Sequence, residues 1–424
     1  MENLKNRKII NKISIFLEDS EVIVLHGSRQ VGKTSIMQIL MANLLRENTT
    51  KNNIVYFDLE DFKYVELCNS GVDNVINYFK GINCDLNKKI YLFIDEIQYL
   101  ENPSSFLKLF HDRYKNKIKV IVSGSSSFEI KSKFKDSLVG RTVDFEIFTL
   151  DFEEFLLFRG ENIDLKAELP DVLHNRLKVL YKEFVIYGSY PAIVLENSIE
   201  KKEIKLKQII NTYLRKDIRD LANIRDITKF NNLISILANQ STGLLNILEI
   251  SNSLNLARQT VEEYLFLLES TYIIKRLRPL YGNIRSELIK MPKVFFEDTG
   301  IVNLLINKTF SEALSGFLFE NSIFINIIRN FPAESIYFWR TAKGNEVDFV
   351  LKDKTIIPIE VKMNFTKKST KNLLYFMDKY KIDKGFFMVF NKDLKNEVTN
   401  IAQIYPWELF NIANLKGTKK LPLV

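Results

Sequence analysis

The chain has 424 residues, and its 60 lysine and arginine residues against 52 aspartate and glutamate residues leave a formal net charge of +8. This length is too great for one ordinary hydrophobic core and predicts two to four domains. With two cysteines and three histidines, neither a disulfide framework nor a histidine–cysteine zinc site is available. The basic charge fits an anionic partner such as nucleic acid, but it does not indicate a fold.

The N-terminal residues are basic without the apolar core of a signal peptide, and no apolar run approaches the roughly 18 residues that span a bilayer. The sequence therefore predicts a soluble, cytoplasmic protein without a membrane partner. Residues 7–17 carry apolar side chains at helical spacing, which predicts a short amphipathic helix before the first strand.

The most informative stretch is residues 21–36, EVIVLHGSRQVGKTSI, which predicts a buried strand, a glycine loop and a helix. The backbone amides of such a loop surround phosphate oxygens, while Lys33 reaches the β and γ phosphates and Thr34 supplies a hydroxyl ligand for Mg²⁺. The predicted ATP-binding residues are Gly27, Ser28, Arg29, Gln30, Val31, Gly32, Lys33, Thr34 and Ser35. The alternative is a glycine turn that contains Gly-Lys-Thr by chance.

Residues 54–59 predict a second strand, and residues 90–95 predict a third that ends in two adjacent carboxylates. Asp95 at the strand tip would hold Mg²⁺ through its water ligands, and Glu96 would polarise the attacking water. The alternative is a buried strand that simply ends in acidic, solvent-facing residues.

Residues 119–122 predict a fourth strand, and residues 142–148 predict a fifth. After the fourth strand, Ser123 or Ser125 would contact the γ-phosphate or the attacking water, unless both are ordinary turn residues. Strands that alternate with helices over residues 1–150 predict a parallel sheet covered by helices, with ligand at the carboxyl ends of the strands.

Between residues 230 and 290 the pattern changes to short helices, over 233–237, 246–254 and 257–270, followed by a strand-like run and a turn at 281–283. Three short helices and a β-ribbon are the order of a winged helix. The third helix, which would read the major groove, opens with Arg258, Gln259 and Thr260. The alternative is an interaction or regulatory module that does not contact DNA.

The last constellation combines Glu320 on an apolar helix, Asp348 at the start of a strand, and Glu360-Val361-Lys362 on the next strand, which is the PD-(D/E)xK nuclease arrangement. Asp348 and Glu360 would bind Mg²⁺, with Glu320 as an outer ligand. Lys362, on the same strand face as Glu360, would activate water or balance the phosphorane charge. The sequence leaves open whether this module cleaves nucleic acid or only binds nucleic acid or protein. Its lysines predict a face suited to phosphate backbones, at positions 362, 367, 368, 371, 379, 381 and 384.

Taken together, these motifs resemble those of bacterial and archaeal AAA-type ATPases of the STAND-related class that carry a C-terminal domain of unknown function. The resemblance covers nearly the whole chain and rests on GSRQVGKTS, LFIDEIQ, VSGSS, GRTVDFEIFTLDFEEFL, YGSYP, LRKDIRD, TVEEYLFLLESTYIIKRLRP, KVFFEDTG, FENSIF, WRTAKGNEVDF and IEVK. It implies ATP binding and a nuclease-like C-terminal module.

The resemblance also implies roles for two further residues. Arg141, just before the fifth strand, would enter a neighbouring subunit's nucleotide site as an arginine finger. The alternative for Arg141 is a local salt bridge. Pro191, in Tyr187-Gly188-Ser189-Tyr190-Pro191, would lie near the adenine as part of a helical lid, unless the segment is a plain helix-ending turn.

The predicted class is α/β, with four parts: a P-loop ATPase core with a parallel sheet (1–160), a helical lid (161–229), a winged helix (230–290) and a restriction-endonuclease-like domain (291–424). The leading hypothesis is an oligomeric, ATP-driven switch or motor that acts with DNA. The rival is an ATP-dependent regulatory or defence scaffold whose nuclease-like domain does not cleave. A signalling switch without a nucleic-acid partner is a third possibility.

Overall fold

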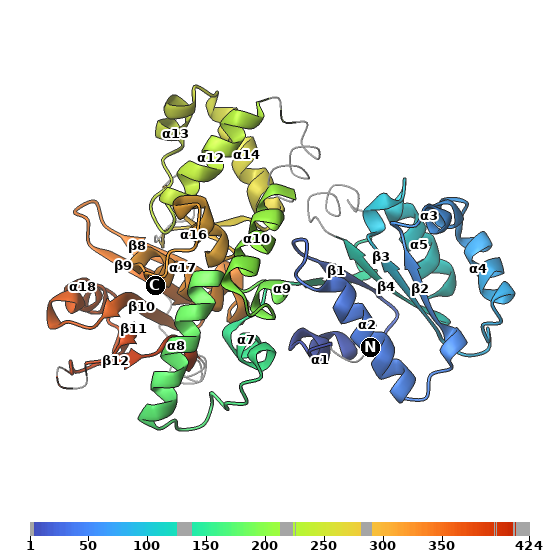
Figure 1. Ribbon diagram of the computed structural model, residues 1–424, viewed down its shortest axis with the longest axis horizontal. Helices are drawn as coiled ribbons and strands as arrows, with labels where there is room; N and C mark the ends of the chain where they lie inside the picture. The colour runs from blue at the N-terminus through green and yellow to red at the C-terminus, as the bar shows by residue number, and fades with distance from the viewer. Residues whose placement is uncertain are drawn as a thin grey trace. The chain divides into compact units, whose positions relative to one another are not determined.

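The computed structural model describes residues 4–124, 138–212, 224, 226–280, 291–393, 395, 397–409 and 412. The chain forms two compact units (Figure 1). Unit 1 comprises Met1–Thr149 with Ser270–Tyr272, and unit 2 comprises Leu150–Glu269 with Ile273–Val424.

Unit 1 contains a five-stranded parallel sheet in the order β2-β3-β4-β1-β5. Every residue of β3 and β4 is buried, which explains why both strands are continuous apolar runs in the sequence. The predicted P-loop sheet is therefore confirmed, and the second to fifth strands begin and end within two residues of their predicted bounds. The strands are β1 (Val22–His26), β2 (Ile54–Asp58), β3 (Ile90–Asp95), β4 (Ile118–Gly124) and β5 (Thr142–Glu146).

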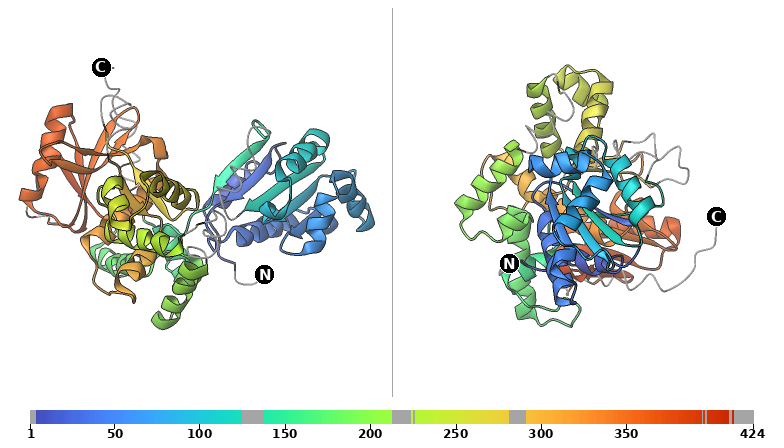
Figure 2. Two further views of the ribbon diagram at one scale, coloured as in Figure 1. Left: turned by 90° about the horizontal axis from the view of Figure 1, so that it is seen from above. Right: turned by 90° about the vertical axis from the view of Figure 1, so that its right-hand side faces the viewer.

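Helices cover both faces of this sheet (Figure 2). On one face, Val24, Phe57 and Leu92 belong to a core that includes apolar side chains of α3, α4 and α5. The helix α2, which follows the glycine loop directly, lies on the other face. The helices and 3₁₀ turns of unit 1 are α1 (Ile9–Ser14), α2 (Lys33–Arg46), η1 (Lys51–Asn53), α3 (Phe62–Asn69), α4 (Val72–Gly81), η2 (Ile97–Tyr99) and α5 (Pro103–Tyr114).

Unit 2 begins with four helices, α7 (Phe152–Arg159), α8 (Asp171–Tyr187), α9 (Pro191–Val194) and α10 (Ile199–Ile209). The buried ring of Tyr181 on α8 packs edge-on against Phe152, and its hydroxyl forms a hydrogen bond with Ser322 Oγ at 2.9 Å. This polar contact places α8 against α17 (Gly316–Asn330), because a buried hydroxyl needs a partner.

Three helices and a two-stranded antiparallel sheet follow: α12 (Ile227–Asn239), α13 (Ile247–Leu254), α14 (Arg258–Ser270), β6 (Ile274–Leu277) and β7 (Lys293–Phe296). This is the predicted order of elements, and β7, which lies beyond residue 290, completes the β-ribbon. The assignment as a winged helix stays a prediction. The turn at 281–283 and the LRKDIRD motif, residues 214–220, lie outside the described residues. The next helix is α16 (Thr299–Asn307).

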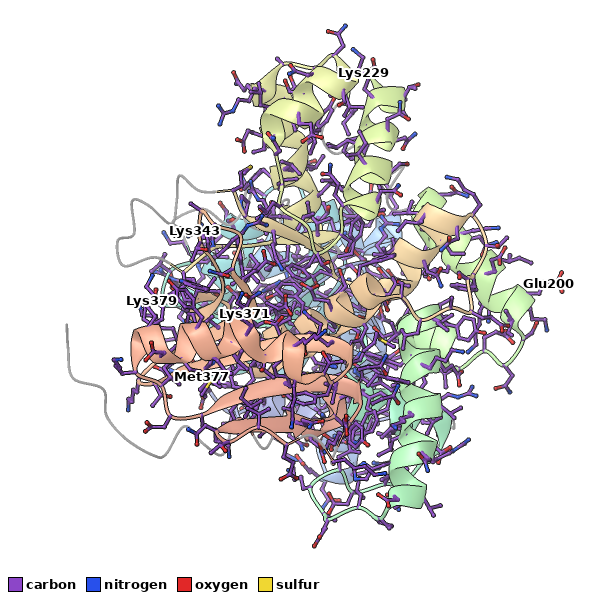
Figure 3. All side chains as sticks on the ribbon, turned by 90° about the vertical axis from the view of Figure 1, so that its left-hand side faces the viewer. Glu200, Lys229, Lys343, Lys371, Met377 and Lys379 are labelled. Carbon is purple, nitrogen blue, oxygen red and sulfur yellow. The ribbon has the colours of Figure 1, made fainter. Side chains whose placement is uncertain are left out.

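The C-terminal sheet has the order β12-β11-β10-β9-β8, antiparallel from β8 to β10 and parallel from β10 to β12. Met377 on α18 (Lys371–Tyr380) belongs to the core on one face of the sheet (Figure 3), and Phe324 of α17 stacks on Phe349 on the other. The strands are β8 (Ile336–Arg340), β9 (Glu346–Lys352), β10 (Ile356–Asn364), β11 (Gly385–Asn391) and β12 (Ile401–Ile404). The predicted α/β class is confirmed by this second, mixed sheet.

Among the helices that the structure describes, none is both long enough and apolar enough to cross a bilayer.

Candidate functional site

The glycine loop lies between β1 and α2, and its two glycines are required for different reasons. A Cβ on Gly27 would lie 2.1 Å from the carbonyl oxygen of Ile147, so no larger residue fits there. Gly32 has φ +97° and ψ +27°, a left-handed conformation that glycine adopts without steric cost. The loop can therefore adopt this conformation only with glycine at both positions.

Lys33, the first residue of α2, is only 5% exposed. Its Nζ donates to the carbonyl oxygens of Gly27, at 3.0 Å, and Ser28, at 2.9 Å. Burial lowers the pKa of Lys33 to about 8, although the carboxylates of Glu96 and Asp95 oppose this shift. The ammonium group is thus held inside the loop by neutral acceptors, where an anionic phosphate would be a stronger partner.

Asp95 at the end of β3 is buried, and its carboxylate accepts hydrogen bonds from three hydroxyl groups. Its Oδ2 accepts hydrogen bonds from Thr34 Oγ1 at 2.6 Å and Tyr56 Oη at 3.0 Å, and its Oδ1 accepts from Ser123 Oγ. The structure therefore brings together three residues that the sequence assigned to one site, Thr34, Asp95 and Ser123. Tyr56 was missed, because a tyrosine inside an apolar strand carries no motif.

Glu96 follows with a left-handed backbone, φ 56° and ψ 52°. Such a conformation costs a non-glycine residue about 1 to 3 kcal/mol. The amide of Glu96 donates to Ser123 Oγ at 3.2 Å, and its carboxylate accepts a hydrogen bond from Gln98 Nε2. Ser123 therefore contacts both members of the acidic pair, while Ser125 lies outside the described residues.

The outer part of the loop is fixed by Arg7, which precedes α1. Arg7 is buried, and its guanidinium donates to the carbonyl oxygens of Val31, at 2.8 Å, and Phe148, at 2.9 Å. Arg29 is half-buried and Gln30, with φ 63°, is exposed. Arg7 was not predicted, since 24 residues separate it from its partner in the loop.

Arg141 forms an ion pair with Asp112 of α5, with Nε 2.8 Å from Oδ1. Its hydrogen bond, followed by one from His111, lowers the pKa of Asp112 to about 2. The local salt bridge that the sequence left open is thus present in the single chain, and the arginine-finger role stays a prediction.

Pro191 is the first residue of α9 in unit 2, and the preceding turn is anchored by Asp298. Asp298 Oδ2 accepts from the amide of Ser189 at 2.7 Å, while Oδ1 caps α16 by accepting from the amide of Ile301 at 3.1 Å. Gly188 is required, because a Cβ there would lie 2.3 Å from Asp298 Oδ1. This turn therefore has a structural function, and adenine contact by Pro191 stays a prediction.

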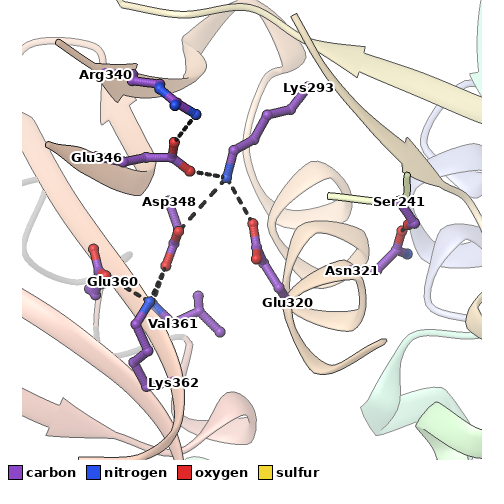
Figure 4. A network of polar contacts seen from close by, with 10 residues as sticks. All are labelled: Ser241, Lys293, Glu320, Asn321, Arg340, Glu346, Asp348, Glu360, Val361 and Lys362. Carbon is purple, nitrogen blue, oxygen red and sulfur yellow. Dashed lines mark hydrogen bonds and ion pairs between the residues drawn. The ribbon is translucent and has the colours of Figure 1, made fainter. Parts of the chain in front are cut away.

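In unit 2 the acids assigned to the nuclease-like site come together from α17, β9 and β10 (Figure 4). Lys362 Nζ lies 2.7 Å from Glu360 Oε1 and 3.3 Å from Asp348 Oδ2. Asp348 Oδ2 also accepts from the amide of Val361 at 2.8 Å. Burial, followed by repulsion from Asp348, raises the pKa of Glu360 to about 8 and that of Glu320 to about 7.

A residue absent from the predicted site lies among these carboxylates. Lys293 of β7 has Nζ 3.0 Å from Glu320 Oε1, 2.7 Å from Glu346 Oε1 and 3.8 Å from Asp348 Oδ1. Burial alone would lower the pKa of Lys293, but the surrounding carboxylates raise it above its ordinary value. Within the described ranges, no group of three or more acidic, histidine or cysteine side chains is arranged to hold a metal ion.

Comparisons with known proteins match three successive segments of the chain. Residues 19–156 match the family described as an AAA domain, and residues 178–312 and 315–410 match two families, each described as a domain of unknown function (DUF8612 and DUF4143). Over residues 19–156 the parallel sheet and the glycine loop after β1 form a P-loop fold, and this segment is similar to AAA domains.

The chain is similar along nearly all its length to an uncharacterized protein of Methanocaldococcus jannaschii, 27% identical over 433 residues, with 96% of this chain and 93% of that protein covered. An uncharacterized protein of Haemophilus influenzae is 25% identical over 389 residues, with 89% and 92% covered. Among solved structures, the Walker-type ATPase of Pyrococcus abyssi has a TM-score of 0.45 and 12% identity, covering 72% of this chain and 96% of that one.

Proposed function

We propose that this protein is an ATP-hydrolysing switch or motor that acts with DNA. One observation carries the catalytic part of the proposal: the carboxylate of Asp95 accepts from Thr34 and Ser123 on the sheet edge where Lys33 lies buried in the glycine loop. Hydroxyl, carboxylate and ammonium are the groups that a triphosphate with its magnesium ion requires at one place.

The residues present fit that ligand. Lys33 would exchange its two carbonyl acceptors for phosphate oxygens, because charged acceptors form stronger hydrogen bonds. Thr34 and Asp95 would hold the magnesium ion, Asp95 through a water ligand. When bound, Mg²⁺ neutralises the charge that develops on the transferred phosphoryl group.

Glu96 is the residue that we assign to the attacking water. Its backbone is held by Ser123 and its carboxylate by Gln98, so the carboxylate is oriented before substrate binds. Glu96 would orient the water and accept its proton. Ser123 would act by positioning both carboxylates, since its hydroxyl contacts Asp95 and the Glu96 amide.

The deciding experiment compares Glu96→Gln with the wild type in ATP binding and steady-state hydrolysis. We expect Glu96→Gln to bind ATP as the wild type does and to hydrolyse it roughly 10² to 10⁴ times more slowly, as for loss of a general base. Glu101→Gln is the matched control, because it makes the same carboxylate-to-amide exchange at an exposed residue outside the site and should leave hydrolysis unchanged. Wild-type turnover by Glu96→Gln would refute the assignment.

Two exposed surfaces of unit 2 support the DNA part of the proposal. Arg258 and Gln259 are exposed at the start of α14, the third of three short helices that precede the β6–β7 ribbon. Lys367, Lys368 and Lys371 are exposed around the start of α18. Lysine and arginine side chains displace counterions from a phosphate backbone and thereby gain affinity without reading sequence.

A second candidate is an ATP-dependent scaffold whose C-terminal domain binds nucleic acid or protein and does not cleave it. The position of Lys293 among Glu320, Glu346 and Asp348 favours this candidate, because a cationic side chain already contacts the acids of the nuclease-like site. Incubation of the protein with duplex, single-stranded and branched DNA in Mn²⁺ separates the two candidates, since cleavage lost in Asp348→Ala supports the nuclease.

A further inference from the structure

The side chain of Lys293 crosses from the β6–β7 ribbon into the C-terminal sheet. Only 4% of it is exposed, and its ammonium group contacts carboxylate oxygens from one helix and one strand: Glu320 on α17, and Glu346 and Asp348 on β9. In Figure 4 these three carboxylates surround the Lys293 Nζ. A buried lysine keeps its charge only when carboxylates compensate for its lost hydration.

The carboxylate oxygens are already divided between two lysines. Asp348 directs Oδ1 toward Lys293 and Oδ2 toward Lys362, and Oδ2 also accepts from the Val361 amide. Glu360 directs Oε1 toward Lys362. A divalent ion would instead need oxygens from several of these acids to converge within about 2.0–2.6 Å of one point.

The charges in the cluster nearly balance without any metal. Even with all four carboxylates ionised, three cationic side chains leave at most one uncompensated negative charge; the carboxylates are those of Glu320, Glu346, Asp348 and Glu360, and the cations are Lys293, Lys362 and Arg340. A divalent cation added to this set would meet two ammonium groups that repel it. The donor set, as it is arranged, therefore does not fit a magnesium site.

We propose that Lys293 is a built-in cation that replaces a divalent metal ion in the C-terminal domain, so that this domain is assembled without metal and does not use metal to cleave nucleic acid. The same contacts fasten β7 to α17 and β9, and hence the three-helix segment with its ribbon to the C-terminal sheet. The inference is independent of ATP hydrolysis and can be tested in the absence of nucleotide.

The test measures Mn²⁺ binding by electron paramagnetic resonance, together with thermal unfolding in EDTA and in Mn²⁺. Every sample carries Asp95→Asn, which removes the carboxylate of the P-loop site. We expect the Lys293-containing protein to bind no stoichiometric Mn²⁺ and to unfold at the same temperature in both conditions. Lys293→Met should unfold at a lower temperature in EDTA, because it leaves buried carboxylates uncompensated, and should gain one Mn²⁺ and regain thermal stability in Mn²⁺.

Lys202→Met is the matched control. Lys202 is also a buried lysine of unit 2, but its Nζ pairs with the single carboxylate of Glu183, at 2.8 Å, which also contacts Arg159. Its loss should lower the unfolding temperature without rescue by Mn²⁺, since one carboxylate does not make a metal site. Adding Asp348→Asn to Lys293→Met should abolish the Mn²⁺ rescue.

Two results would overturn the proposal. One is stoichiometric Mn²⁺ binding by the Lys293-containing protein that is lost in Glu320→Gln and Asp348→Asn, because a metal would then displace the lysine. The other is a folded Lys293→Met protein that gains no Mn²⁺. If Lys293→Met does not fold in either condition, Lys293→Gln is substituted, and the Mn²⁺ titration of the Lys293-containing protein decides the question without any variant at this position.

Discussion

Thr34 Oγ1 donates to Asp95 Oδ2 at a distance of 2.6 Å, which joins the start of α2 to the end of β3. If these groups hold Mg²⁺, Thr34→Val should weaken Mg²⁺-dependent ATP binding by at least about tenfold, as expected when the shell around a metal is disturbed. Isothermal titration with ATP, with and without Mg²⁺, measures the effect. Thr34→Ser retains the hydroxyl and should bind normally; equal losses in the two variants would show that the hydroxyl is irrelevant.

Arg7 should determine the shape of the glycine loop from outside the motif. Its removal takes this donor from the carbonyl oxygens of Val31 and Phe148, and the buried hydrogen bond to Val31 should account for a loss of about 1 to 3 kcal/mol. We expect Arg7→Met to lower both thermal stability and ATP affinity. Arg46→Met is the control, since Arg46 is exposed at the end of α2. An Arg7→Met protein with native ATP affinity would remove Arg7 from this role.

The ionisation of Lys33 should appear in the pH dependence of ATP binding. Burial lowers the pKa of Lys33 to about 8, so the nucleotide-free protein loses this positive charge as pH rises above 8. An anionic ligand binds the protonated form, and apparent ATP affinity should therefore fall by up to about tenfold per pH unit above that point. The same shift means that the unfolded chain binds more protons between about 8 and 10.5, so this group adds stability to the nucleotide-free fold as pH rises through that window.

Equilibrium binding of a fluorescent ATP analogue between pH 7 and 10 measures this effect. Lys33→Met should bind weakly at every pH and lack the decline. A wild-type affinity that is constant to pH 10 would show that burial does not lower the pKa of Lys33 in the nucleotide-free protein.

Arg141 gives opposite expectations for its two proposed roles. An arginine finger contributes about 10³- to 10⁵-fold to turnover, whereas a partly exposed ion pair contributes little to stability. We expect the protein to form a closed oligomer in ATP, Arg141→Ala to lose most of its ATPase activity, and Asp112→Asn to retain it. Mass photometry and steady-state hydrolysis test these points. A monomer in ATP, with Arg141→Ala as active as the wild type, would leave only the ion pair with Asp112.

DNA binding should depend steeply on salt. The logarithm of affinity should fall with the logarithm of salt concentration with a slope of about −0.9 for each phosphate contacted. We expect Arg258→Glu and the pair Lys367→Glu with Lys368→Glu to lower both the affinity and the slope, as measured by fluorescence anisotropy on duplex DNA. Lys108→Glu reverses an exposed charge on α5 of unit 1 and is the control. Affinity that is flat between low and high salt would contradict DNA as the partner.

The sequence by itself determined the elements and motifs whose residues are close together in the chain. The glycine loop and the acidic strand tip can be read locally, because strand, turn and helix signals depend on neighbours within a few residues. The five predicted strands of unit 1 correspond to those observed. The spacing of apolar residues likewise predicted the order of the short helices before the β6–β7 ribbon.

Only the tertiary structure decided which distant side chains meet at these sites. Arg7 meets Val31 across 24 residues, Tyr56 meets Asp95 across 39, and Lys293 meets Glu320 across 27. A lysine before an apolar strand has no sequence signal for what its ammonium contacts, because that depends on how two sheets and a helix pack. The net charge of a buried cluster depends on all the groups that face it. The PD-(D/E)xK motif contained only the acids and Lys362, so it did not predict that Lys293 contributes a further positive charge.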